Sequence, residues 1–440
     1  MPLALKDSTT GVFASYLAQF AGRDPEPGWL DGLRQRAFTR FSERGFPGRK
    51  DEGWRQTNLA AIAEGVFEPQ PAPPPKQLVP RLRDLDLPGV DWSADALRLV
   101  FINGRFAAGL SSTAAPQGCS IGALSQRQAP LDLGHLDHSD ERDQAFVQLN
   151  TAFLQDAAVV EVAAGVVVEP PIAILHLTTG SAAAKGISHP RTLILAGRES
   201  QARVIETSAG FPGEVYFTNA VAAVEIGENA AVEYTRIGQD SLAAFQVSKL
   251  RSRQLRDSRF AAHSFALGSA LTRNNVHAIL DGEGAECTLN GLFALGGAQH
   301  VDNSTVLDHA KPLGTSREYY KGVLDGKSAG VFNGRIIVRQ DAQHTDAIQS
   351  NKNLLLSDSA ATVNAQPQLE IYADDVRCTH GATVGQLDAQ ALFYLRSRGL
   401  GLEESRKLLI YAFAADVLGR VQASGLREQL EGLLWRKWAV

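Results

Sequence analysis

Residues 324–385 read "LDGKSAGVFNGRIIVRQDAQHTDAIQSNKNLLLSDSAATVNAQPQLEIYADDVRCTHGATVG" and repeat one pattern at a nearly constant step. An aspartate beside a turn-like cluster recurs at Asp325, Asp341, Asp358 and Asp374, so neighbouring turns are almost equally spaced. Aspartate suits a turn because its carboxylate accepts a hydrogen bond from a backbone N–H group two residues further on. Runs of β-forming residues separate these turns, so the stretch predicts short strands joined at regular intervals.

The constant step distinguishes two folds that are both built from short strands. A step of roughly 16 or 17 residues at about 3.3 Å per residue spans roughly 50 Å, which suits one coil of a β-solenoid with short faces. A β-sandwich would also contain many short strands, but it does not need a fixed step. We therefore predict a mainly β protein with a right-handed parallel β-helix, and the sandwich is the alternative.

β-Forming runs separated by Gly, Asn, Asp and Ser extend over residues 150–386, the predicted β-helix core. The stretch "LAAFQVSKLRSRQLRDSRF" (242–260) is assigned to strands because it is rich in β-branched and aromatic residues. Residues 387–440 instead place apolar residues at three- and four-residue spacing, which predicts a C-terminal helical region. Helices in this position can cap the open end of a solenoid or present a docking face to another protein.

The chain before the core divides into two parts. Residues 1–68 contain two amphipathic patterns, at 11–22 and 29–45, and form a predicted N-terminal helical region. Residues 69–149 are predicted to begin with an extended Pro-rich linker and to continue as a small mixed α/β region. Two apolar runs around Asn103-Gly104 predict a β-hairpin in this region.

The composition narrows the classes of partner and compartment. The 440 residues are 44% hydrophobic and carry a net charge of −5, without a concentrated basic patch, so neither nucleic acid nor a membrane is expected as a partner. The most apolar stretch (157–175) contains two glutamates and a Pro-Pro pair, so it is expected to form strands rather than a membrane span. Three widely separated cysteines and the lack of a signal-peptide pattern predict a cytoplasmic protein.

Common catalytic motifs are not matched. Gly326-Lys327-Ser328 imitates a phosphate-binding loop, but Lys321 stands where that motif needs a glycine. His300, His309 and His344 are interpreted as exposed or hydrogen-bonded residues rather than ligands. Two of the cysteines, Cys119 and Cys287, are interpreted as buried inert thiols.

Cys378 and His380 have a spacing that carries chemistry. Residues i and i+2 of a strand point to the same side, so the two side chains would be neighbours. Thiolate and imidazole are both good ligands for iron or zinc. Two ligands do not complete a tetrahedral site, so further ligands would have to come from elsewhere in the fold or from a partner. The spacing leaves two interpretations open, half of a metal site or a packed pair inside the solenoid.

Longer motifs identify a family. The sequence closely resembles the SufB/SufD family of SUF iron–sulfur cluster assembly proteins over nearly its whole length. The motifs that carry the resemblance are "GFPGRKDEGWRQTNL" (45–59), "FINGRF" (101–106), "LNTAF" (149–153), and the two long stretches 300–358 and 367–400. "LLLSDSA" (354–360) has Ala360 where SufB has its essential cysteine, so the resemblance is to the SufD branch.

The resemblance implies a non-catalytic scaffold in an ATPase-driven complex. It implies pairing with SufB through the β-helices and docking of the ABC-type ATPase SufC on the C-terminal helical region. A nascent iron–sulfur cluster or transient iron would be held at the SufB interface, and reduced flavin is associated with the complex as an electron source, although no flavin motif is found here. The isolated chain could be a homodimer or await its partner, and the sequence leaves this open.

The same resemblance assigns a residue to the cluster. The family's C-S-H-G-A-T motif corresponds to residues 378–383 here, so His380 inherits the role of ligand to iron or to the nascent cluster. Cys378 is the second candidate, and Thr379 replaces the family's serine.

Two other functions compete with this one. The first is a β-helix enzyme that acts on carbohydrate or transfers acyl groups, but the observed step is not a multiple of the six-residue repeat of solenoid acyltransferases. The second is a purely structural SufB partner in which His380 only packs at the interface.

Overall fold

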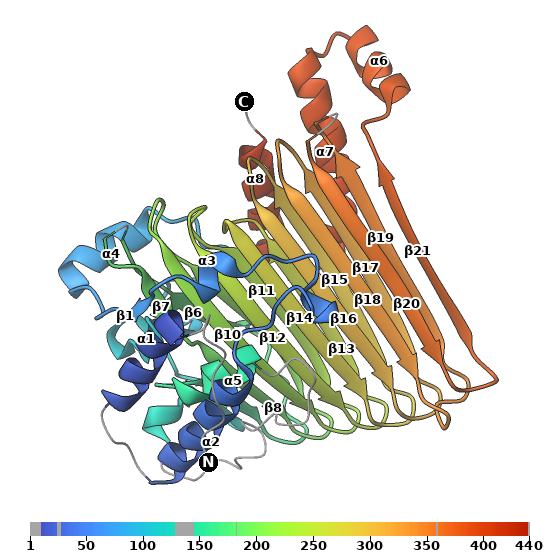
Figure 1. Cartoon of the computed structure of the whole chain (residues 1–440). Coiled ribbons are helices and arrows are strands. Elements are labelled where there is room, and N and C mark those ends of the chain that lie inside the picture. Colours follow the sequence, from blue (N-terminus) through green and yellow to red (C-terminus); the bar gives the residue numbers. More distant parts are fainter. Residues whose placement is uncertain (1–9, 24–27, 128–144, 182, 358–359, 439–440) are drawn as a thin grey trace.

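The protein is a β-helix wound from two long sheets (Figure 1). The computed structural model describes residues 10–23, 28–127, 145–181, 183–357 and 360–438. In this part of the chain, sheet A has 11 strands and sheet B has 10. Successive core strands alternate between the sheets and pair in parallel with the strand of the next coil. Parallel pairing confirms the β-helix and excludes the sandwich, whose neighbouring strands are antiparallel.

The strands of sheet A follow one another in space from the C-terminal end to the N-terminal end. Their order is β20 (Thr362–Ile371), β18 (Ala329–Val338), β16 (His300–His309), β14 (Leu271–Leu280), β12 (Phe245–Gln254), β10 (Tyr216–Ile226), β8 (Arg191–Ala196), β5 (Ala158–Val162) and β4 (Cys119–Ala123), with β7 (Gly186–Ser188) beside β10 and β1 (Glu68–Pro69) beside β7. β12 confirms that the stretch 242–260 contains a strand.

The strands of sheet B also follow one another in space from the C-terminal end to the N-terminal end. Its order is β21 (Arg377–Gly385), β19 (Asp346–Leu355), β17 (Thr315–Leu324), β15 (Glu286–Leu295), β13 (Arg259–Ala266), β11 (Ala231–Gln239), β9 (Gln201–Ala209), β6 (Ile172–Leu177), β2 (Leu97–Ile102) and β3 (Arg105–Phe106).

One coil of the solenoid is about twice as long as predicted. In sheet A, His300 pairs with Ala329 and Ala329 pairs with Thr362, so the chain passes two of the regularly spaced turns before it returns to the same sheet. The expectation that a single step between aspartates completes a coil is therefore wrong. Each late strand has about ten residues and spans about 33 Å, so one strand and its turn cross a single face. The regularly spaced aspartates mark turns at both edges of a flattened coil, and one of them, Asp358, lies outside the described residues.

Alternate residues of both sheets point into the solenoid and form its main core. Leu307, Phe332 and Ile336 are completely buried in this cluster. A parallel sheet needs cover on both faces, so the outer face of each sheet must also be covered where it is apolar.

The N-terminal region covers the outer face of sheet A. The predicted helices are confirmed as α1 (Thr10–Ala21) and α2 (Gly28–Arg44), and they are joined by α3 (Ala60–Ala63) and α5 (Ala145–Ala152). Phe20, Phe41 and Trp54 from this region form one cluster with Phe217 and Val247 of the sheet. This contact closes the early coils against solvent (Figure 1).

Residues 69–149 are tied into the solenoid. The hairpin at Asn103-Gly104 is confirmed, since β2 and β3 pair in antiparallel fashion and both turn residues have positive φ. β2 also pairs in parallel with β6, so the hairpin extends sheet B. The expected linker 69–76 is shorter than predicted, because α4 (Pro75–Arg83) begins within it. Proline at the first helical position is favourable because that N–H has no helical partner.

The C-terminal helices lie on the side of the solenoid. They are α6 (Ala389–Ser397), α7 (Leu402–Leu418) and α8 (Ser424–Lys437). Val417 and Leu430 pack with Phe265 and Leu292 of sheet B, so α7 and α8 cover the outer face of this sheet. These helices leave the last coil uncovered, so the capping alternative is wrong, and α6 projects away from the strands (Figure 1).

Membrane insertion of a helix is not indicated. Across the described ranges, no helix is long and apolar enough to span a bilayer.

Replacing a core side chain of the solenoid should destabilise the whole protein. Phe332→Ala removes a ring that is 0% exposed, and we expect the free energy of unfolding to fall by about 3–5 kcal/mol. Chemical denaturation measures this loss. Leu242→Ala is the control, because Leu242 is 64% exposed and its loss should change stability by no more than about 0.5 kcal/mol. Equal effects of the two substitutions would contradict this description of the core.

Candidate functional site

The solenoid ends at an uncovered coil formed by β20 and β21. β21 pairs with β19 on one side, and its other edge has no strand partner in the described part of the protein. Pro367 in the middle of β20 fits this position, because an edge strand needs no ladder hydrogen bond on its outer side. Tyr372, Val384 and Ile371 expose large apolar side chains there. An edge of this kind is a ready template for pairing with another chain. We call β20 and β21 the open end.

Cys378 and His380 lie on β21 at this open end. In the register of the sheet, Cys378 pairs with Ala347 and His380 pairs with Gln349. Ala347 and Gln349 are both buried and point into the solenoid. The two candidate ligands therefore continue the interior rows of the solenoid on the same side of their strand, as their spacing predicts.

The two candidates differ in accessibility. Cys378 is half-buried and packs against the main core. Burial raises the pKa of its thiol, and the Asp346 carboxylate adds to the increase. His380 is exposed and can turn toward an approaching group.

The chain brings two candidate ligands together rather than a complete set. No group of three or more His, Cys, Asp or Glu side chains that could hold a metal ion occurs among the described residues.

The interior row that ends at His380 is polar in the late coils. Glu318, Gln349 and His380 pair in sequence on β17, β19 and β21, each one coil after the one before. Glu318 and Gln349 are 2% and 1% exposed. Gln349 Nε2 donates a 2.6 Å hydrogen bond to Glu318 Oε2. Burial raises the pKa of Glu318 to about 7. No local motif marks Glu318 or Gln349 in the sequence, although their equal spacing links them to His380 once the coil length is known.

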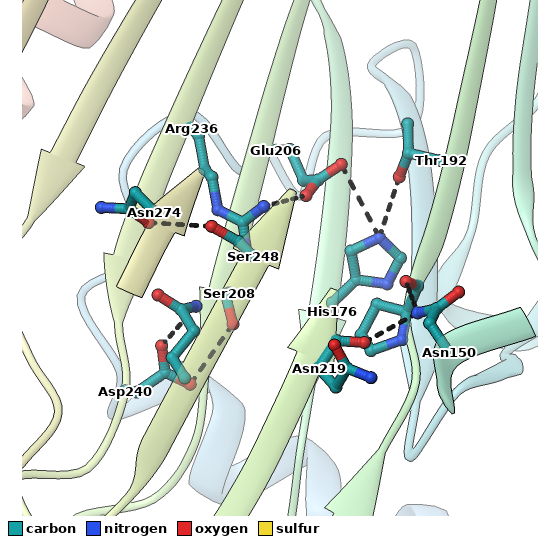
Figure 2. A network of polar contacts seen from close by, with 12 residues as sticks. Asn150, His176, Thr192, Glu206, Ser208, Asn219, Arg236, Asp240, Ser248 and Asn274 are labelled. Carbon is teal, nitrogen blue, oxygen red and sulfur yellow. Dashed lines mark hydrogen bonds and ion pairs between the residues drawn. The ribbon is translucent and has the colours of Figure 1, made fainter. Parts of the chain in front are cut away.

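A second polar cluster lies inside the early coils (Figure 2). His176 Nε2 is 3.2 Å from Thr192 Oγ1 and 4.0 Å from the Glu206 carboxylate, and Arg236 reaches the same carboxylate at 3.5 Å. Burial lowers the pKa of His176 to about 4, so the ring is neutral near pH 7. The strand order places several strands of sheet B between this cluster and β21, so it is separate from the His380 site.

The three histidines interpreted above as exposed or hydrogen-bonded residues fit that interpretation. His300 Nε2 lies 3.2 Å from Thr57 Oγ1, and His309 Nε2 lies 2.9 Å from Ser316 Oγ. His344 is exposed in a turn and pairs with Asp375 at 3.0 Å. Each of these three histidine rings therefore has a partner side chain within this protein.

The remaining cysteines differ from each other. Cys287 is buried as predicted, and burial raises the pKa of its thiol. Cys119 is partly exposed, so the prediction of a buried thiol is wrong at this position.

A second candidate surface lies on the C-terminal helices. Five large apolar side chains of these helices are exposed, namely Phe393, Tyr394, Leu402, Leu408 and Trp435. α7 is anchored to sheet B, because Lys321 Nζ donates to the Phe413 carbonyl at 2.7 Å and lies 2.9 Å from the Asp416 carboxylate. We call the five side chains the helical apolar surface. Exposed aromatic side chains of this kind are enriched at protein–protein contacts.

The buried carboxyl group of Glu318 should make stability depend on pH. Its pKa is about 7 in the folded protein against 4.5 for an ordinary glutamate, so the folded state binds the extra proton and loses stability as pH rises from 4.5 to 7. Glu318→Gln cannot ionise, so its stability relative to the wild type should increase between pH 5 and pH 8 by on the order of 2–3 kcal/mol. Denaturation at both pH values measures this difference. Glu428→Gln, an exposed control on α8, should behave like the wild type. An unchanged difference for Glu318→Gln would show that Glu318 has an ordinary pKa.

Comparison with known families agrees with this architecture. The family model described as "SUF system FeS cluster assembly, SufBD core domain" matches residues 177–413, and the model described as "SufBD protein N-terminal region" matches residues 22–174. The boundary between the two falls at the end of β6.

Several relatives match nearly the whole chain. The iron-sulfur cluster assembly protein SufD of Escherichia coli (strain K12) is 31% identical over 397 residues, which are 90% of each chain. An iron-sulfur cluster assembly SufBD family protein of Synechocystis is 32% identical over 413 residues, 91% of this chain and 89% of the relative. The iron-sulfur cluster assembly protein SufD of Bacillus subtilis is 26% identical over 448 residues, 97% and 98% of the two chains.

Proposed function

Because this chain belongs to the SufB/SufD family of SUF iron–sulfur cluster assembly proteins, we propose that it is a non-catalytic scaffold subunit of a cytoplasmic SUF complex. It pairs with SufB through the open end of the solenoid and docks the ATPase SufC through its C-terminal helices. His380 contributes a ligand to transient iron or to the nascent cluster at the SufB interface.

One observation carries this proposal. His380 is exposed on the last strand of the β-helix, its imidazole is of a type that binds metals, and the edge of that strand is free in the described structure. A second β-helix that added its own strands there would continue both sheets and would bring its side chains against His380. The ligand pair of one chain would then be completed by side chains of the other.

The chemistry of the two side chains suits temporary binding. A neutral imidazole nitrogen of His380 can donate to iron, and imidazole in place of thiolate raises the reduction potential of an iron–sulfur site. SufB would supply the thiolate, since this chain has Ala360 where SufB has its essential cysteine. The site would hold its cargo with fewer thiolates than a permanent cluster, which suits a scaffold that must release the product. Acid should weaken loading, because both ligand types must be deprotonated to bind.

The helical apolar surface supports the second contact. Phe393 and Tyr394 of α6 are 75% and 55% exposed. The helix α6 that carries them projects beyond the strands, where a globular ATPase subunit could approach without displacing a strand (Figure 1).

Two features of the complex complete the proposal. A reduced flavin would supply electrons at the level of the assembled complex. The open end would pair with a second copy of this chain when SufB is absent, because an unpaired edge strand accepts any compatible strand.

Loss of the imidazole should block cluster assembly without disrupting the complex. We expect His380→Ala, co-expressed with SufB and SufC from the same source, to yield the intact complex but little iron–sulfur cluster, because the exposed ring contributes little to packing. Iron and sulfide content and the visible absorption of the purified complex measure the loss.

The stability of the isolated variant is the control for this experiment. Its free energy of unfolding should lie within about 0.5 kcal/mol of the wild type. Normal cluster content in the His380→Ala complex would reduce this chain to a structural partner of SufB. Cys378→Ala should have a smaller effect than His380→Ala.

Removing two exposed aromatic rings should weaken the contact with the ATPase. The double variant Phe393→Ala/Tyr394→Ala removes apolar area from α6, and we expect SufC to bind at least about tenfold more weakly, since aromatic side chains dominate protein interfaces. Titration calorimetry with purified SufC measures the affinity. Leu242→Ala, an exposed apolar residue distant in the sequence, is the control. Unchanged affinity of the double variant would exclude α6 as the docking site.

A further inference from the structure

The interior row that leads to His380 changes character along the solenoid. Consecutive pairing in sheet B joins the members of this row, Val204, Tyr234, Ala262, Leu289, Glu318, Gln349 and His380. The early members are apolar except for the tyrosine hydroxyl, as a solenoid core requires. The last two buried members are a carboxyl and an amide group. Burying such groups costs free energy unless every polar atom finds a partner.

One polar atom of Gln349 has no such partner. Gln349 Nε2 donates to Glu318 Oε2 at 2.6 Å, but Gln349 Oε1 accepts no hydrogen bond in the described structure. Glu318 lies on β17, on one side of Gln349, and His380 lies on β21, on the other side. The hydrogen bond to Glu318 therefore holds the amide nitrogen toward β17 and leaves the amide oxygen free to accept a hydrogen bond from the side of β21.

The opposite sheet leaves room for this amide. A Cβ atom at Gly334 of β18 would lie 2.3 Å from Gln349 Nε2 and 2.8 Å from its Cδ atom, closer than atoms can approach. The lack of a side chain at Gly334 thus makes space for Gln349 between the sheets. Gly334 across the core therefore makes room for the amide of Gln349, and the carboxyl group of Glu318 beside it fixes the amide by a hydrogen bond.

Resting on the proposed function, we propose that Gln349 is a positioning residue for His380. Its Oε1 atom accepts a hydrogen bond from one ring N–H of His380, which selects one neutral tautomer and leaves the other ring nitrogen unprotonated and directed to the open end. Neighbouring strands lie about 4.8 Å apart, so the ring of His380 can reach the amide of Gln349 when it turns inward. Metal-binding histidines generally use their second nitrogen in this way.

The first test follows the tautomer in the isolated full-length chain. With ¹⁵N-labelled histidine, the ring nitrogen signals of His380 are assigned by their loss in His380→Ala. At pH 8 we expect one neutral tautomer in the wild type and a mixture of both in Gln349→Met, which keeps the volume of the side chain but lacks the amide oxygen. Gln368→Met, an exposed glutamine on β20, is the matched control and should resemble the wild type. Identical His380 signals in the wild type and in Gln349→Met would overturn the inference.

The second test measures binding of ferrous iron alone to the purified complex with SufB and SufC under anaerobic conditions. We expect Gln349→Met to bind iron about 10–100-fold more weakly, the usual effect of losing the partner of a ligating histidine. The exchange variant Glu318→Gln/Gln349→Glu keeps one carboxyl and one amide group in the row and places an acceptor beneath His380, so it should restore binding. A variant that only disturbed packing would not be rescued in this way.

The two proposals fail differently in these experiments. Full iron affinity in Gln349→Met, together with loss of affinity in His380→Ala, would overturn the role of Gln349 and keep the role of His380. Full affinity in His380→Ala would overturn His380 as a ligand, whereas the tautomer measurement would still decide whether Gln349 orients the ring.

Discussion

Parallel backbone hydrogen bonding from each coil to the next is the constraint on which this structure depends. Once β17, β19 and β21 are aligned by their ladders, every residue lies beside the residue one coil earlier. Because side chains alternate between the two faces of a strand, a row that begins inside the solenoid stays inside it. This is why residues a whole coil apart in the chain, such as Glu318, Gln349 and His380, become neighbours without any local sequence signal that connects them.

The same constraint makes the two ends of the solenoid different. At the N-terminal end, helices and a hairpin cover the early coils, and the Trp54 and Phe217 side chains share one cluster. At the C-terminal end, α7 and α8 pack on the side of sheet B, and β20 and β21 remain uncovered. A β-helix cannot satisfy the backbone groups of its last coil by itself. In this protein the unsatisfied coil is also the coil that carries His380, so the proposed pairing surface and the candidate iron ligand coincide.

Polar residues inside the late coils are unfavourable for stability. Glu318 is 2% exposed and its pKa is raised to about 7, so its environment resists the charged form. An apolar residue of similar size would fill the same volume without this penalty. Groups that a fold tolerates at such a cost are characteristic of functional positions. Gln349 lies one coil before His380 and Glu318 two coils before it. The proposed orientation of His380 by Gln349 explains why polar residues stand in this row, which packing alone does not explain.

Local sequence patterns were sufficient for much of this architecture. The helices near residues 11–22 and 29–45, the turn at Asn103-Gly104 and the strand within 242–260 all follow from short-range preferences, and the structure confirms them. The family motif at residues 378–383 was likewise visible, and it singled out His380 before any geometry was known. Each of these conclusions depends on residues that are close in the chain.

Only the tertiary structure decided how those elements join. The aspartate step measured the distance between turns, but a turn looks alike whether it closes half a coil or a whole one, so the coil length became clear only from pairs such as His300 with Ala329. Gln349 and Gly334 have no motif, and their relation depends on two sheets that face each other across the core. The sequence by itself determined which strands and helices form and that His380 is a candidate ligand. The winding of the chain decided what lies beneath that ligand, because contacts between coils join residues that no local pattern connects.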